Sequence, residues 1–213
     1  MKRLISIRIF LIDVFLLFGS FIRMRKSDKQ NQLTTLDWRI RRCRKCPLCK
    51  SRFHAVPGEG PANARIFFLG EAPGKGEDLQ GKPFVGRSGK FLNYLLEKSG
   101  FVRNEIYITS SVKCRPPKNR NPRPNELKIC KQNWLNKQIE IINPKIIVLL
   151  GKVALKQVLG ASSKLDKFHG RLIRHNGLSC FPTYHPAAAM RFSKLKKNIL
   201  KDLIKLKRLA KIL

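Results

Sequence analysis

Short apolar segments alternate with helical segments along most of this chain, and this order restricts its fold more than any other feature. Strands that are joined by helices normally lie parallel in one sheet. We therefore expect an α/β fold, a three-layer sandwich with a central, mostly parallel four-stranded sheet. In such folds, ligands bind in loops at the carboxyl ends of the strands. The predicted strands lie in residues 64–70, 105–112, 145–151 and 179–186, the last of which ends in a loop.

Four helices are predicted between and after these strands. Ser88 is the expected cap of the first, and Asn125 caps a second that runs to about Ile142. Residues 151–160 form a third helix, and residues 193–213 form a basic amphipathic fourth. The apolar face of the fourth helix indicates packing against the sheet, with contact between its basic face and DNA as the alternative. That apolar face contains Leu195, Ile199, Leu203, Leu206 and Ala210.

The length of 213 residues allows one domain with tails. We assign residues 36–213 to this domain. We expect residues 1–35 to be an N-terminal extension that is poorly ordered or an over-extended start, with Met24 as the true first residue. Two charged residues interrupt the apolar run at 4–22, and each costs about 2.5–3.5 kcal/mol at the centre of a spanning helix. We predict a cytoplasmic protein without membrane association, with a membrane anchor and a cleaved signal peptide as alternatives.

The charge balance indicates a polyanionic partner. Lys and Arg total 45 against 13 for Asp and Glu, which gives a net charge of +32. Clustered Lys and Arg bind phosphate backbones by releasing condensed counterions, whatever the base sequence. A nucleic acid is the expected partner, and a merely solvated lysine-rich surface is the alternative.

Four of the six cysteines form two pairs with charged neighbours. Cys43 and Cys46 are separated by two residues, while Cys114 follows a predicted strand and Cys130 lies in the next helix. Four thiolates favour either structural zinc or a [4Fe-4S] cluster, and the ligand type does not separate the two. Free buried thiols are a third reading, and disulfides are not expected in a reducing compartment. Cys180 lies in a predicted strand and is assigned to the core.

Five ordered motifs between Cys43 and the C-terminus resemble those of the family 4 uracil-DNA glycosylases, iron-sulfur enzymes with an α/β sandwich fold. This resemblance implies a [4Fe-4S] cluster on Cys43, Cys46, Cys114 and Cys130, with Cys49 as a non-ligand. The motifs are Cys43-x-x-Cys46-Pro-Leu, Gly70-Glu71-Ala72-Pro73-Gly74, Gly81-Lys82-Pro83-Phe84-Val85-Gly86, Lys113-Cys114-Arg115-Pro116-Pro117 and His185-Pro186-Ala187.

The resemblance also implies a role for each loop. Residues 70–74 would position the attacking water, Phe84 would stack on the base, and His185 would contact uracil O2. An aromatic face offsets part of the cost of flipping a base out of a duplex, which is a few kcal/mol. A donor at the pyrimidine oxygen stabilises the charge that develops on the leaving base. The alternatives are structural, a core phenylalanine and a histidine that only holds the loop.

Glu71 is the expected acceptor for the attacking water because it is the only carboxylate of its motif, with Asn119 as an orienting partner and loop bracing as the alternative role. Gly70 and Ala72 are assigned to substrate binding, together with Phe84. The expected contacts to DNA phosphate are Arg87, Arg115 and Arg191.

One residue departs from the family pattern. The family usually has asparagine before the third cysteine, where its amide reads the uracil edge, and this chain has Ser110. A hydroxyl is shorter than an amide and rotates, so one hydrogen bond or a water bridge must replace two. Ser110 is therefore a substrate-binding residue that affects base specificity or rate.

We expect a monofunctional DNA-repair glycosylase that hydrolyses the N-glycosidic bond of uracil in DNA and leaves an abasic site. The alternatives are a catalytically weakened iron-sulfur DNA-binding protein and a glycosylase with altered base specificity. We further expect a monomer that acts on uracil-containing DNA without a small-molecule organic cofactor.

Overall fold

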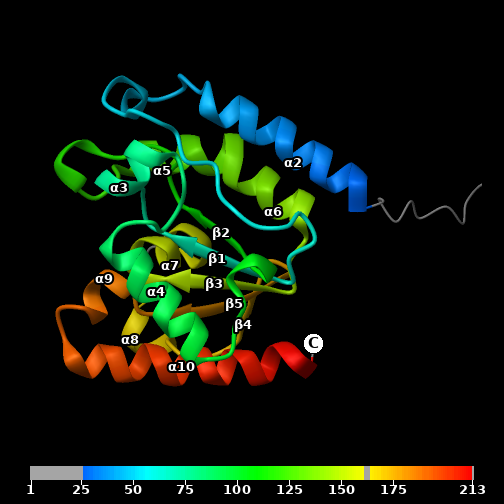
Figure 1. Ribbon diagram of the computed structural model, residues 1–213, viewed down its shortest axis with the longest axis vertical. Helices are drawn as coiled ribbons and strands as arrows, with labels where there is room; N and C mark the ends of the chain where they lie inside the picture. The colour runs from blue at the N-terminus through cyan, green and yellow to red at the C-terminus, as the bar shows by residue number, and fades with distance from the viewer. Residues whose placement is uncertain (1–25, 161–163, 213) are drawn as a thin grey trace, which may run out of the picture.

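The computed structural model describes residues 26–160 and 164–212 (Figure 1). At its centre is a five-stranded sheet in the order β2-β1-β3-β5-β4. The four predicted strands are confirmed and run parallel, and β4 pairs antiparallel with β5 at one edge. The strands are β1 (Ile66–Gly70), β2 (Tyr107–Ser110), β3 (Ile146–Leu150), β4 (Ile173–His175) and β5 (Leu178–Thr183).

Strand β4 was not predicted, so the expected count of four strands is corrected to five. It has only three residues, and Arg174 and His175 leave it without an apolar run. A hairpin joins it to β5 through Asn176 and Gly177, whose φ angles are 47° and 76°. Asn-Gly is the preferred pair for a two-residue hairpin turn because both positions need positive φ.

Two layers of helices cover the sheet, which confirms the three-layer sandwich (Figure 1). Within β1, Phe68 packs toward α4 and α10, whereas Phe67 packs toward α2, α6 and α7. Successive side chains of a strand point to opposite faces, so a strand covered on both faces is apolar along most of its length. The covering helices are α4 (Arg87–Lys98), α9 (Pro186–Ala189) and α10 (Ser193–Ile212) on one side, and α2 (Lys26–Arg41), α6 (Asn136–Ile142), α7 (Gly151–Leu159) and α8 (Leu165–Phe168) on the other.

Helix starts differ from the expected caps. Helix α4 begins at Arg87 with Gly86 as its N-cap, so Ser88 lies in the first turn. The long helix begins with α5 (Pro124–Cys130), in which proline occupies the first turn, so Asn125 is not the cap. A π-helical turn (Lys131–Leu135) then continues into α6. The remaining elements are α3 (Lys75–Gln80) and the 3-10 turns Pro47–Lys50, Arg103–Glu105 and Pro117–Asn119.

The N-terminal helix corrects part of the expectation for residues 1–35. Residues 26–35 belong to α2, which packs on α6 and buries Leu33, Leu36 and Ile40. Residues 26–35 are therefore helical and not poorly ordered. The apolar run at 4–22 and Met24 lie outside the described residues. Within the part of the chain that is described, no helix has the length and apolar character needed to cross a membrane.

The predicted core positions are confirmed at two places. Cys180 is completely buried between the sheet and the α7 layer. Helix α10 buries Ile199, Leu203 and Leu206 against α4 and the sheet, as its spacing predicted.

Candidate active site

The carboxyl ends of β1, β2 and β5 bring the predicted site residues to one edge of the sheet. Gly70 ends β1 and is paired with Ser110 at the end of β2. His185 follows β5 and begins α9. Phe84 comes from the loop between α3 and α4, and its ring centroid lies 6.0 Å from that of His185.

Gly70 allows these side chains to come together. A Cβ atom on Gly70 would lie 2.7 Å from Cζ of Phe84 and 3.5 Å from Oγ of Ser110. The Phe84 ring is 6% exposed and also belongs to the core cluster around α4. Phe84 has a φ of 52°, and a Cβ atom on Gly89 would overlap its carbonyl oxygen. The loop is therefore pressed onto α4, and this fixes the ring beside the histidine.

His185 is a neutral hydrogen-bond donor at physiological pH. Burial lowers its pKa to about 4, against an opposing effect of the Glu77 carboxylate. Nδ1 accepts the backbone N–H of Ala187 at 3.1 Å. A neutral imidazole carries one proton, so an accepting Nδ1 leaves the proton on Nε2. The ring can therefore donate from Nε2.

Glu71 and Asn119 line one cavity of about 440 Å³ together with His185. Burial raises the pKa of Glu71, and its carboxylate has no hydrogen-bond partner among the residues that the structure describes. Oδ1 of Asn119 accepts a hydrogen bond from Nε of Arg115 at 2.7 Å, which leaves the amide nitrogen as the donor. The other lining residues are Ala72, Pro73, Gly74, Pro116, Arg120, Asn121, Ala187, Ala188, Arg191 and Phe192.

Ser110 is 5% exposed and lies at the end of β2, beside Gly70. Its carbonyl oxygen accepts a hydrogen bond from Nζ of the fully buried Lys113 at 2.8 Å. Its hydroxyl has no partner within the described ranges. This hydroxyl lies near Gly70 and Phe84 and is free to bind a ligand.

The four predicted ligand cysteines line a second, separate cavity of about 10 Å³. Its other lining residues are Leu48, Val112, Lys113, Ile129 and Trp134, so Cys49 is not among them. Sγ of Cys114 accepts from Arg52 at 2.9 Å, and Sγ of Cys43 accepts from Nε1 of Trp134 at 3.2 Å. Within the described ranges, no three His, Cys, Asp or Glu side chains are arranged to hold a metal ion.

Burial raises the pKa of Cys114 to about 11 and that of Cys130 to about 12. Arg52 opposes the shift at Cys114, and Lys113 opposes it at Cys130. A bound metal would hold these thiols as thiolates and so reverse this shift. Zinc and iron-sulfur centres take sets of four cysteine thiolates, and the four cysteines that line this cavity match such a set.

A sequence model of the Uracil DNA glycosylase superfamily matches residues 57–205. The chain is 42% identical over 177 residues to the type-4 uracil-DNA glycosylase of Sulfurisphaera tokodaii, a match that covers 79% of this chain and 80% of that protein. It is 43% identical to the type-4 uracil-DNA glycosylase of Thermotoga maritima, with coverages of 81% and 92%. The chain belongs to the uracil-DNA glycosylase superfamily. Its expected resemblance to family 4 is confirmed. A type-5 uracil-DNA glycosylase of Pyrobaculum aerophilum is 34% identical over 62% of this chain and 65% of that protein.

In this superfamily member, two of the three predicted phosphate contacts lie on a common groove. Arg87 and Arg191 line a cavity of about 780 Å³ that adjoins the Glu71 cavity, because Gly74, Asn119 and Arg191 line both. Arg115 lines neither of them and is half-buried against Asn119. We call the two adjoining cavities the active-site groove.

Glu77 is a positioning residue that the sequence analysis missed. Its buried carboxylate accepts three backbone hydrogen bonds, from Gly74 at 3.1 Å, Val85 at 3.0 Å and Gly86 at 2.8 Å. It thereby ties the Glu71 loop to the Phe84 loop. A carboxylate three residues after Gly74 at a helix start was an available signal, because acidic side chains there commonly bond the orphan N–H groups.

Glu126 has the same function in the proline-rich loop and was also missed. It is 3% exposed and accepts from both terminal nitrogens of Arg120, at 2.9 and 2.7 Å, and from the backbone of Arg123 at 2.7 Å. The Arg120 hydrogen bonds lower the pKa of Glu126. A bidentate pair is the strongest form of this interaction, so the loop that carries Asn119 is held rigidly.

Proposed function

We propose that this chain is a monofunctional uracil-DNA glycosylase that hydrolyses the N-glycosidic bond of uracil in DNA. The observation that carries the proposal is the convergence of Phe84, Ser110, His185 and Glu71 around Gly70 in a member of this superfamily. A protein that only bound DNA would not need an aromatic face, a neutral donor and an unpaired carboxylate at one place.

Each residue has a role that its environment supports. The extruded base stacks beside Phe84, which offsets part of the unstacking cost. Nε2 of His185 donates to a pyrimidine oxygen as the C–N bond breaks and negative charge moves onto the base. Glu71 accepts a hydrogen bond from the attacking water, and the amide of Asn119 orients that water. The proton of the water passes to the carboxylate, and the products are free uracil and an abasic sugar.

The structural support for DNA binding is the basic edge of the groove. Arg87 and Arg191 are exposed on its walls, in a chain of net charge +32. Contacts from such residues to phosphate position a duplex without reading its sequence, which suits an enzyme that searches for one damaged base.

We infer that Cys43, Cys46, Cys114 and Cys130 hold a [4Fe-4S] cluster. When bound, the cluster supplies a crosslink between α2, the β2 loop and α5, and takes no part in base release. We expect about four iron and about four sulfide per chain. Stoichiometric zinc would instead identify the alternative centre.

Ser110 supports a second candidate, a glycosylase with altered base specificity. Its hydroxyl can donate or accept at the same position, so it discriminates less between base edges than a fixed amide does. Hypoxanthine, xanthine and mismatched thymine in the same oligonucleotide context test this candidate. Release of any of them at a rate above that of uracil would make it the better description.

The deciding experiment uses a labelled oligonucleotide with one uracil, followed by alkali, which cleaves abasic sites. Cleavage is expected with the purified protein and, before alkali, no strand break. A His185→Ala variant serves as the control for contaminating glycosylases. If the protein yields no more cleavage than this variant on any of the four bases, the enzymatic proposal is wrong and the DNA-binding alternative replaces it.

A further inference from the structure

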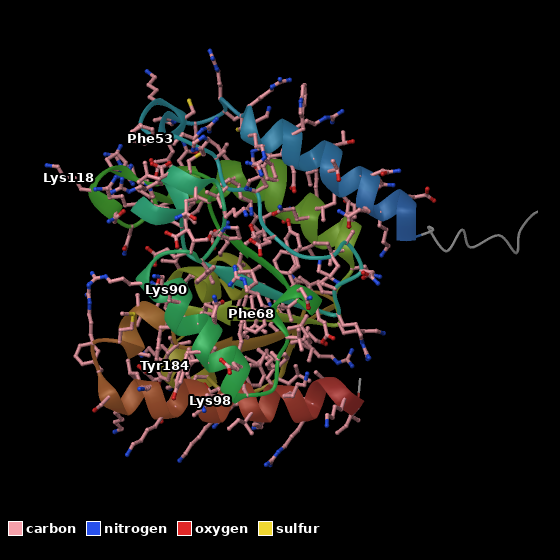
Figure 2. The ribbon with its side chains drawn as sticks, in the orientation of Figure 1. Phe53, Phe68, Lys90, Lys98, Lys118 and Tyr184 are labelled. Atoms are coloured by element: carbon pink, nitrogen blue, oxygen red, sulfur yellow. The ribbon has the colours of Figure 1, made fainter. Side chains whose placement is uncertain are left out.

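A row of cations and aromatic rings leaves the active-site groove along α4. Its members on α4 are Arg87, Lys90, Phe91, Tyr94 and Lys98, which are three or four residues apart and therefore share one face of the helix. Figure 2 labels Lys90 near the start of α4 and Lys98 near its end. Arg87 itself lines the groove, so the row begins there and extends about 16 Å at 1.5 Å per residue.

Helix α10 adds a lysine to the same surface. Nζ of Lys196 lies 5.7 Å from the ring centroid of Phe91 and 5.6 Å from that of Tyr94. Nζ of Lys98 lies 5.9 Å from the Tyr94 ring. We call Arg87, Lys90, Phe91, Tyr94, Lys98 and Lys196 the α4–α10 strip.

The rings of the strip are arranged for stacking and are accessible. Phe91 and Tyr94 are near parallel, with an interplanar angle of 15° and centroids 6.1 Å apart. Phe91 packs in part against the core around α4, whereas Tyr94 is 42% exposed. An exposed ring flanked by ammonium groups offers a base a π-face and its phosphates a counter-charge, which is the design of single-strand binding surfaces.

The charge of the surrounding surface is complementary to a nucleic acid. Helix α10 carries seven lysines and one arginine, and its one acidic residue, Asp202, is buried and accepts from Thr183 and His169. Glu97 is the single carboxylate of α4. Packing against the sheet requires only the apolar face of α10, so these cations are free to bind an external polyanion.

We propose that the α4–α10 strip binds an unpaired DNA strand that continues out of the active-site groove. Bases in a duplex are stacked on each other and cannot stack on Tyr94, so the rings favour a single strand over a double helix. The inference rests on the proposed function only in taking DNA as the ligand. It adds a site that the excision chemistry does not need, and it gives the enzyme a preference for lesions in longer unpaired segments.

The experiment measures fluorescence anisotropy of the full chain with uracil-free single strands of 8 and 20 nucleotides and with a 20-base-pair duplex. Lys90→Ala/Lys98→Ala is compared with Lys152→Ala/Lys156→Ala, which removes two exposed charges from α7 on the opposite face of the sheet. Tyr94→Ala is compared with Tyr94→Trp, which keeps a stacking ring. All five positions are exposed, and a thermal melt checks that each variant is folded.

Tyr94→Ala and Lys90→Ala/Lys98→Ala should each weaken binding of the 20-nucleotide strand by about tenfold, a typical loss for one stacked base. The 8-nucleotide strand spans about 27 Å even at the 3.4 Å rise of stacked DNA, so it also covers the strip and should show a similar loss. Binding of the duplex should change less than about twofold, and Tyr94→Trp and the α7 variant should bind nearly as wild type. The proposal is wrong if the α4 and α7 lysine variants lose affinity for the single strand equally, or if the strip variants lose as much affinity for the duplex as for the single strand. It is also wrong if the strip variants bind the single strand as the wild type does, in which case a protein partner would be the better candidate for this surface.

Uracil release from an 8-nucleotide substrate is measured in parallel. If the wild type releases no uracil but the strip variants lose binding as expected, the glycosylase proposal fails and the strip proposal stands. If every strip variant releases uracil normally and binds the single strand as the wild type does, the strip proposal fails and the glycosylase proposal stands.

Discussion

The active-site groove and the cysteine cluster lie on either side of the segment that follows β2, and they differ in how their polar groups are paired. The carboxylate of Glu71 in the groove and the hydroxyl of Ser110 beside Gly70 have no side-chain or backbone partner within the described residues. In the cysteine cluster, Arg52 and Trp134 donate to sulfur atoms. Buried polar groups that lack partners cost stability, so they are retained where a substrate supplies the missing bond.

Lys113 joins the two regions. Its buried ammonium donates to Oγ1 of Thr109 at 2.6 Å and to the carbonyl of Ser110, and it is adjacent to Cys114. Loss of order in the cysteine cluster would therefore displace the end of β2. Changes in the groove should affect chemistry while the fold remains, whereas changes in the cluster should affect both.

The largest effect is expected from Cys114→Ser, which removes one proposed ligand from a buried site. The variant should lose the iron and most of the soluble folded protein, because an unpaired set of buried ligands is left behind. Cys49→Ser is the matched control and should keep the metal content and melting temperature of the wild type. Metal analysis and circular dichroism check both variants, and equal damage from the two would remove the distinction between ligand and non-ligand cysteines.

His185→Ala should lower kcat by about 10²–10³-fold, the usual loss of one donor to a developing anion. His185→Gln retains an N–H donor and should recover part of this loss. The melting temperature should change little in either variant. Single-turnover excision provides the measurement, and a normal rate with His185→Ala would show that the groove does not use this donor.

The pH dependence of excision should separate the two titratable groups of the groove. Burial raises the pKa of Glu71 above its ordinary value of 4.5, so the ionised acceptor is lost as the pH falls through that raised pKa. The rate should then fall about tenfold per pH unit. His185 stays neutral down to its pKa of about 4, so this limb belongs to Glu71. Glu71→Gln should abolish the limb, and a limb that persists in this variant would contradict the assignment.

Glu77→Gln should reduce kcat about tenfold while KM changes less, because the amide cannot accept from both loops at once. Glu140→Gln, at an exposed carboxylate on α6, is the control and should leave both constants unchanged. Rates at a series of substrate concentrations give the two constants. A rise in KM alone would mean that Glu77 affects DNA binding and not the placement of Phe84 and Glu71.

The smallest effect is expected from Ser110→Asn. A fixed amide should raise the preference for uracil over the other deaminated bases by about threefold, since it adds a second hydrogen bond in fixed geometry. Competition between two labelled substrates in one tube measures this ratio. A lower preference for uracil would indicate that the hydroxyl is already the better partner in this pocket.

The sequence predicted the fold where apolar character alone decides it. The segments around Phe67 and Ile147 are apolar at every position, and only a sheet covered on both faces explains them. Strand β4 was missed because hairpin pairing, and not burial, holds it. The start of α2 was missed although Leu33, Leu36 and Ile40 follow a helical spacing, because charged residues dominate that segment.

The sequence indicated the individual candidate site residues, but it did not indicate the side chains that hold their loops in place. Glu71, Phe84 and His185 stand in recognisable motifs, and their meeting follows from the rule that parallel strands place their carboxyl ends together. The contact of Arg52 with Cys114 joins residues 62 apart in the chain, and the contact of Glu77 with Val85 joins residues eight apart in two different loops. No helical or strand spacing encodes either contact. Arg115, a predicted phosphate contact, does not line the active-site groove and donates to Asn119, a contact that no local pattern indicates.

The π-helical turn between α5 and α6 has a consequence for how this chain can vary. Such a turn holds one more residue than an α-helix would, so it marks an insertion in an otherwise regular helix. If the same residues wound as a regular α-helix without this turn, everything after it would be rotated by about 100° relative to Cys130. Ile142 and Gln138 would then turn out of the core. The π-helical turn therefore lets Cys130 face the other cysteines while Gln138 and Ile142, on the same long helix, remain buried in the core.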